Sequence, residues 1–137
     1  MTLLDALDYG SVFIFALTGA LVASRAQLDI VGFLFVAALT AVGGGTLRDL
    51  LLDRNPVFWI ENPSIIAVSS LAAALTFLTA HKFESRLKAV MWFDAVALAV
   101  AVPAGVGAAL ALDHHWGVVL IMGIVTGCFG GLMRDVV

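Results

Sequence analysis

An arginine followed by an aspartate occurs twice in this chain, each time just after a glycine-rich stretch. Residues 40–49 read TAVGGGTLRD, and residues 126–135 read TGCFGGLMRD. Both copies lie in long apolar runs, where an ionised side chain at mid-bilayer costs roughly 2.5–3.5 kcal/mol. A duplicated, glycine-broken apolar helix that ends in a charged pair is typical of proteins that move ions or small solutes across a membrane.

Polar residues in and around the two copies are candidates for lining or gating such a path. The same shift that superimposes the repeated segments also superimposes Asp8 on Asp94, whose carboxylates would favour cations at the mouths of the path. The full set of candidates is Thr40, Arg48, Asp49, Thr126, Arg134, Asp135, Asp8 and Asp94.

Each of these residues also has a structural interpretation. The Arg-Asp pairs can lie near helix ends, extend to the membrane interface or neutralise their own partners. Asp8 and Asp94 stand where helices are expected to begin, so N-capping is the simpler explanation for them. The hydroxyls of Thr40 and Thr126 either line water or bond back to the preceding turn.

The glycines of the two copies are predicted to bend their helices. Glycine in a helix interior costs up to about 1 kcal/mol relative to alanine, so a run of them favours a kink or a short unwound stretch. Carbonyl groups bared at two such breaks would line a narrow cation path. The alternative is close helix packing. The predicted pore-kink positions are Gly43, Gly44, Gly45, Gly130 and Gly131.

Composition excludes most other classes of function. Apolar residues make up 62% of the chain, charged residues make up 12%, and the mean hydropathy is +1.08, which together indicate a lipid environment. The slightly negative net charge and the lack of a basic tract argue against nucleic acid as a partner. The single cysteine, the His114-His115 pair and the glycine triplet match no nucleophile, metal or phosphate-loop pattern. We therefore expect no enzyme activity, no cofactor and no bound metal.

Five apolar runs, each close to the length of a transmembrane helix, divide the chain. Short connections link them, and most of the basic loop residues fall on one side if the spans alternate. The positive-inside rule then places the N-terminus outside and the loop His81–Lys88 in the cytoplasm. The predicted spans are Tyr9–Ser24, Ile30–Leu47, Pro63–Ala80, Ala95–Leu112 and Trp116–Met133.

An odd number of spans separates the two copies of the motif, so the copies cross the membrane in opposite directions. This predicts an inverted repeat with a pseudo-twofold axis in the membrane plane. We expect residues 1–81 to form a first three-helix repeat. Residues 82–137 would form an incomplete second repeat, with helices four and five present and the sixth and seventh helices missing.

The run Ala41–Leu51 (AVGGGTLRDLL), followed by Asn55-Pro56-Val57-Phe58-Trp59, resembles the prokaryotic branch of the TRIC family, the trimeric intracellular cation channels. Phe93-Asp94 and the second glycine motif fit the same family. The resemblance implies an all-α membrane protein with inverted three-helix repeats, a seventh helix, and glycine-kinked second and fifth transmembrane helices. It also implies potassium conduction through one pore per subunit, three subunits in an assembly, and location in a prokaryotic inner membrane.

Two departures limit what the resemblance implies. Cys128-Phe129 replaces the first part of the second glycine triplet, so a milder break is expected there. The Lys-Glu-Val signature of animal members is missing, so no phosphoinositide binding is carried over. Related bacterial sequences are also described as glycine transporters, which keeps a carrier for a small zwitterion as the alternative function.

Overall fold

Six helices make up the part of the chain that the computed structural model describes, namely residues 3–26, 28–53, 57–61, 63–79, 86–111 and 115–136. Within these ranges no residue forms a strand. The protein is therefore an all-α membrane protein, as predicted. The helices are α1 (Leu3–Arg25), α2 (Ile30–Leu51), α3 (Phe58–Glu61), α4 (Ser64–Thr79), α5 (Arg86–Ala111) and α6 (Trp116–Val136).

Each predicted span lies largely within one long helix, but two helices begin earlier than expected. Helix α1 begins at Leu3 rather than Tyr9, and α5 begins at Arg86 rather than Ala95. A helix satisfies its backbone hydrogen bonds internally, so it extends past the apolar run into polar flanks. The start of α5 lies in the predicted loop His81–Lys88, of which residues 81–85 are outside the described residues.

The connection after α2 contains a short helix that the sequence did not predict. The backbone leaves α2 through Asp53, whose φ of 57° is the left-handed conformation that often ends a helix. The four-residue helix α3 then precedes α4. Of the connection Asp53–Asn62, residues 54–56 and 62 lie outside the described residues. Because α3 adds one element, α4, α5 and α6 correspond to the predicted third, fourth and fifth spans.

Three stretches are long and apolar enough to cross a membrane by length and composition: Ala6–Arg25, Ile30–Leu51 and Lys88–Leu110. Two further apolar helical stretches, Ser64–Thr79 and Trp116–Leu132, are shorter. The 16 residues of α4 extend about 24 Å at 1.5 Å per residue, which is less than the ~30 Å of a typical hydrocarbon core.

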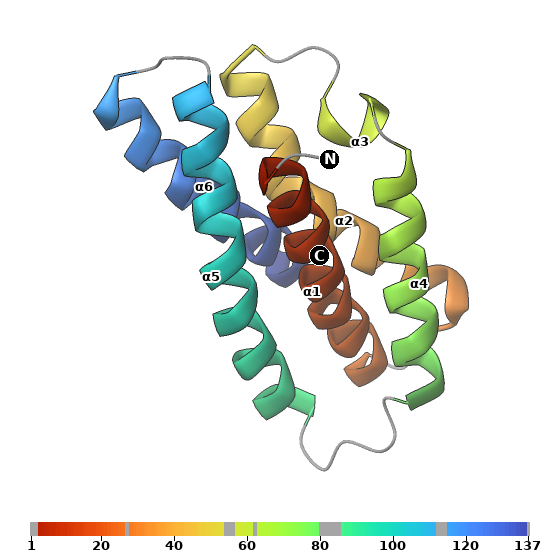
Figure 1. Cartoon of the computed structure of the whole chain (residues 1–137). Coiled ribbons are helices and arrows are strands. Elements are labelled where there is room, and N and C mark those ends of the chain that lie inside the picture. The colour runs from red at the N-terminus through yellow and green to blue at the C-terminus, as the bar shows by residue number, and fades with distance from the viewer. Residues whose placement is uncertain are drawn as a thin grey trace.

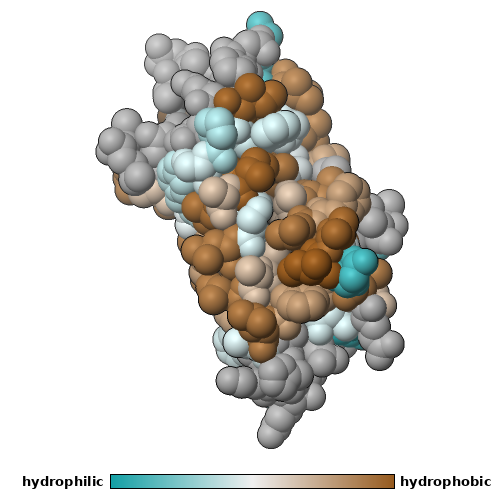
Figure 2. All heavy atoms as spheres, turned by 90° about the vertical axis from the view of Figure 1, so that its right-hand side faces the viewer, coloured by the Kyte–Doolittle hydropathy of each residue, from teal (hydrophilic) through white to brown (hydrophobic). Residues whose placement is uncertain are grey.

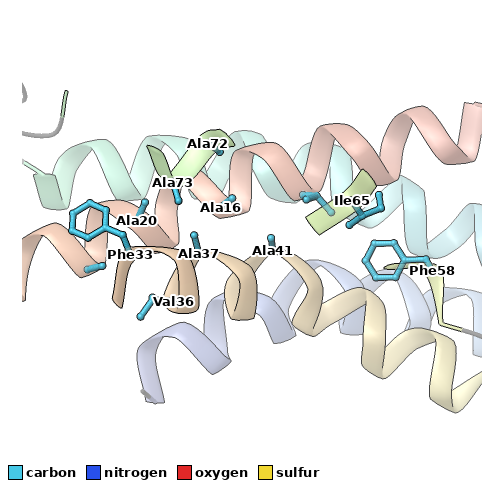
Figure 3. Close-up of a cluster of buried hydrophobic side chains, with 12 residues drawn as sticks. Ala16, Ala20, Phe33, Val36, Ala37, Ala41, Phe58, Ile65, Ala72 and Ala73 are labelled. Atoms are coloured by element: carbon cyan, nitrogen blue, oxygen red, sulfur yellow. The ribbon is translucent and has the colours of Figure 1, made fainter. Parts of the chain in front are cut away.

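Helix α1 lies at the centre of the bundle (Figure 1). It packs against α2, α4 and α5, while α6 packs against α2 and α5. Alanines dominate the cluster between α1, α2 and α4, among them Ala16, Ala20, Ala37, Ala41 and Ala72 (Figure 3). Small side chains allow helix backbones to approach closely, which is how helices gain packing energy where lipid supplies no hydrophobic drive.

The outer face of the bundle is apolar. Figure 2 shows the side that carries α4, and hydrophobic residues cover most of its middle. Large apolar side chains of α4 are exposed there, including Leu71, Leu75, Phe77 and Leu78. An exposed apolar face of this extent is what contact with lipid tails requires.

Candidate functional site

The two glycine motifs meet where α2 crosses α6. A Cβ atom placed on Gly44 would overlap the carbonyl oxygen of Thr126, and a Cβ atom on Gly130 would overlap that of Thr40. Only glycine permits this approach, because any side chain would push the helices apart. The glycines therefore allow α2 and α6 to pack in direct contact, which is the close helix packing given above as the alternative to a kink.

The contacts at this crossing are reciprocal: when one motif is superimposed on the other, each contact becomes the other contact. Gly44 of the first copy meets Thr126 of the second, and Gly130 of the second meets Thr40 of the first. The neighbouring helices repeat the relation: Gly19 of α1 abuts the Thr40 hydroxyl on α2, while Gly105 abuts the Thr126 hydroxyl on α6. Reciprocal contacts of this kind are the pattern that a two-fold relation between the halves produces.

Both motif helices continue through their glycines. Helix α2 is unbroken from Ile30 to Leu51, α6 is unbroken from Trp116 to Val136, and no described glycine has a positive φ. The expected short unwound stretch is therefore wrong for α2, because packing against α6 holds the glycines in helical geometry. A bend without unwinding stays a prediction. The hydroxyls of Thr40 and Thr126 donate to the carbonyl oxygens of Val36 and Met122, four residues earlier, at 2.7 Å each.

Arg48 forms the centre of a buried ion-pair cluster near the end of α2. Its Nη1 atom lies 2.9 Å from Oδ1 of Asp8, and its Nε atom lies 2.9 Å from Oδ1 of Asp49. Oδ2 of Asp49 accepts the backbone N–H of Phe58 at 2.8 Å. The guanidinium also lies over the Phe58 ring, 5.2 Å from its centroid, at cation–π distance.

The cluster explains how a charge is tolerated here. Arg48 and Asp49 are both 0% exposed, and Asp8 is 6% exposed. Buried charges persist when they are paired and hydrogen-bonded, and this arrangement supplies both. The pairing also joins two helices, since Asp8 belongs to α1 and Arg48 belongs to α2. The Nη2 atom of Arg48 nevertheless has no hydrogen-bond partner among the described residues, which costs about 1–3 kcal/mol for a buried donor.

The capping interpretation of the two repeated aspartates is wrong. Asp8 lies inside α1, which begins at Leu3, and Asp94 lies inside α5, which begins at Arg86. Neither carboxylate can therefore cap the first turn of its helix. Asp8 instead binds Arg48 across the bundle.

Asp94 and Asp135, which the repeat superimposes on Asp8 and Asp49, lie along a groove. Half-buried Asp94 and exposed Asp135 line a groove of about 550 Å³ between α1, α5 and α6. Its other walls are mostly apolar and include Phe15, Leu98 and the glycines Gly127 and Gly131. The side chain of Arg134 lies outside the described residues, so the structure does not place it relative to these carboxylates.

Three residues of the first copy belong to this site although the sequence did not single them out. Phe58 covers Arg48, and Trp59 donates its indole N–H to Oγ1 of Thr46 at 2.9 Å. Thr46 in turn donates to the carbonyl oxygen of Val42 at 2.6 Å. The available signal was the aromatic pair that closely follows Asp49, which we used only as part of the family resemblance.

Comparison with known proteins gives one family match and several close relatives. A family model described as glycine transporter matches residues 5–81 and 91–137. The UPF0126 membrane protein of Vibrio cholerae is 39% identical over 98% of this chain and 57% of its own length. The UPF0126 inner membrane protein YadS of Escherichia coli K12 is 39% identical over 95% of this chain and 63% of its own length. The chain thus spans about three fifths of these curated relatives.

Solved structures share the fold. The TRIC trimeric intracellular cation channel orthologue from Rhodobacter sphaeroides matches with a TM-score of 0.96 at 43% identity, over 99% of this chain and 70% of that one. A structure described as the basis for conductance through TRIC cation channels matches with a TM-score of 0.82 at 28% identity, over 98% of this chain and 66% of that one.

Replacing Arg48 with methionine is expected to destabilise the bundle by about 3–5 kcal/mol, because Asp8 and Asp49 would lose their compensating charge. Chemical unfolding in detergent, followed by tryptophan fluorescence, measures the change. Arg25→Met is the matched control, since Arg25 is exposed at the end of α1 and its loss should change stability by less than about 0.5 kcal/mol. Equal stability of the two variants would contradict the structural role of the cluster.

Replacing Gly44 with alanine is expected to cost about 1–3 kcal/mol in the same unfolding measurement, because the added methyl group must displace α6 at Thr126. Gly10→Ala is the control, since a Cβ atom there lies 3.4 Å from Cγ1 of Val100, close to ordinary contact. That variant should be neutral or more stable, as alanine favours a helix. A Gly44→Ala protein as stable as Gly10→Ala would show that the crossing is not tightly packed.

Proposed function

Because the chain belongs to the prokaryotic TRIC family and also matches the glycine transporter family model, we propose that it conducts monovalent cations, mainly potassium, across a membrane. One observation carries the proposal: the likeness to the Rhodobacter sphaeroides cation channel extends over 99% of this chain at 43% identity. Fold alone does not establish function, so the proposal also has to agree with the charges and contacts of the site.

The charges of the site agree with a path for cations. The crossing of α2 and α6 is closed by direct contact at Gly44 and Gly130, so we place the route beside the crossing rather than through it. The groove between α1, α5 and α6 is such a route, and it carries the carboxylates of Asp94 and Asp135. Acidic side chains along a pore favour cations over anions.

We further propose that the chain is organised as an inverted repeat, with residues 1–81 as the first unit and residues 82–137 as part of the second. The reciprocal contacts of Gly44 with Thr126 and of Gly130 with Thr40 support this. Such repeats place a binding site or path at their interface and let one unit rock against the other. Gly43 to Gly45, together with Gly130 and Gly131, are the positions proposed to bend as the route opens.

The assembly and its orientation are also proposals. The Rhodobacter sphaeroides protein is described as trimeric, which supports a homotrimer with one pore per subunit. Relatives named as inner membrane proteins support the inner membrane of a prokaryotic cell. The positive residues of the loop His81–Lys88 support its cytoplasmic location, which leaves the N-terminus outside.

The second candidate function is transport of a small zwitterion such as glycine, and the description of the matching family model favours it. Inverted repeats suit a carrier as well as a channel. The two functions differ in the transport that can be measured. A channel gives stepwise currents, whereas a carrier gives saturable uptake of its substrate.

The purified chain in planar bilayers is expected to give unitary currents when potassium is the only permeant cation. Uptake of labelled glycine into proteoliposomes is measured on the same preparation. Saturable glycine uptake without current steps would contradict the channel function and support the carrier function. The absence of both activities would contradict both proposed functions.

Gly44→Leu is expected to abolish the unitary currents, because the larger side chain would wedge α2 away from α6 and displace the residues of α6 that line the groove. Gly117→Leu is the control, since a Cβ atom at Gly117 meets, among the described residues, the His115 ring alone, at 3.4 Å. Oligomer size in detergent checks that both variants assemble. Unchanged current from an assembled Gly44→Leu protein would contradict the role of the glycines in the pore.

A further inference from the structure

Phe129 of α6 lines two hollows in the surface of the bundle. One is the groove of about 550 Å³ between α1, α5 and α6, which Phe15 and Leu98 line from the neighbouring helices. The other is a pocket of about 290 Å³ that is formed mostly by α2, including Gly43, and by Trp59, and to which α6 contributes Phe129. Phe129 therefore stands between the groove and the pocket.

The two copies of the glycine motif differ most in side-chain volume at the position of Phe129. The repeat superimposes Phe129 on Gly43, so the second copy has a phenyl ring where the first copy has bare backbone. Gly43 lines the pocket, and its lack of a side chain leaves that space open. The bulk that keeps the pocket apart from the groove is therefore supplied from α6, by Phe129.

The groove follows one face of α6 past Phe129. Its lining residues on this helix recur at spacings of three or four from Ile124 to Asp135, which is one side of a helix. At 1.5 Å per residue this stretch is about 16 Å long. Phe129 lies near the middle of the stretch, between the apolar end at Ile124 and the carboxylate of Asp135. A cation that moves from one end of the groove to the other has to pass it.

A carboxylate and a phenyl ring act differently on a passing cation. Carboxylates raise the local concentration of cations, and Asp94 and Asp135 do so along the groove. A phenyl ring has no oxygen with which to replace the water that surrounds a cation. A cation beside Phe129 therefore keeps much of its hydration, and the free width at the ring decides which cations pass.

We propose that Phe129 sets the width of the conduction route and, with it, the size of the cations that the route admits. The proposal rests on the proposed channel function, with the groove as its route. With the ring in place, the groove is a narrow path for small inorganic cations. Without the ring, the groove and the pocket beside Gly43 join into one wider hollow, and larger organic cations pass as well.

The test changes the volume of the side chain at position 129 and measures conduction in planar bilayers. Phe129→Ala is expected to raise the unitary potassium conductance roughly twofold and to make dimethylammonium permeant, because the route widens. A misfolded protein cannot produce such a gain. Phe129→Trp is expected to lower the conductance. Phe35→Ala is the matched control, since Phe35 is 60% exposed on α2 and its loss should change neither conductance nor permeability.

Thiol labelling tests the separation of the two hollows without any current. Cys128 lines the groove and is exposed, so a membrane-impermeant thiol reagent reaches it when the groove holds water. Val42 lines the pocket, and Val42→Cys in a Cys128→Ser background reports access to the pocket. Adding Phe129→Ala to this reporter is expected to speed its labelling, because the reagent then enters from the groove. Adding Phe35→Ala should leave the labelling rate unchanged.

The outcomes separate the role of Phe129 from the channel function. Equal conductance and equal cation permeability in the parent, Phe129→Ala and Phe129→Trp proteins would overturn the role of Phe129 while the channel stands. Equal labelling of the pocket with and without Phe129→Ala would overturn the separation of the two hollows by this ring. Faster labelling without current in any protein would support that separation and contradict the channel. Unlabelled Cys128 in the parent would overturn the groove as the route, and the inference with it.

Discussion

The structure depends on a positive charge that has been placed inside an apolar bundle. Arg48 is fully buried, and the surrounding elements are arranged to satisfy it: α1 contributes Asp8, α2 contributes Asp49, and the segment after α2 contributes Phe58. An unpaired arginine in this position would be expelled or would recruit water. The cluster therefore fixes the register of α1 against α2 and also holds α3 at the end of the bundle.

Small residues allow the rest of the bundle to form around that charge. Alanines fill the space between α1, α2 and α4, and glycines bring α2 into backbone contact with α6. The α2–α6 interface therefore has a fixed register, because a slide of one helix along the other would bring a side chain, in place of a glycine, against a backbone carbonyl oxygen.

Much of the helical organisation could be predicted from the sequence, because long apolar runs and charged boundaries carry that signal directly. The close packing at the glycine motifs could be predicted as an alternative to a kink, since glycines at repeated positions favour close approach of helices. The pairing of Arg48 with Asp8 was not predictable, because Asp8 is distant in sequence and its position near an expected helix start suggested a cap. The roles of Phe58 and Trp59 depend on how the chain turns after Asp53, which no periodic pattern encodes.

The short third span has a consequence for the surrounding lipid. Helix α4 has 16 residues, and its exposed leucines and phenylalanine extend over a height smaller than a typical hydrocarbon core. Acyl chains beside α4 therefore have to compress or tilt, at a cost of fractions of a kcal/mol per Å of mismatch. A thin bilayer removes this cost and a thick one increases it, so membrane thickness biases where the protein resides and how its helices lean.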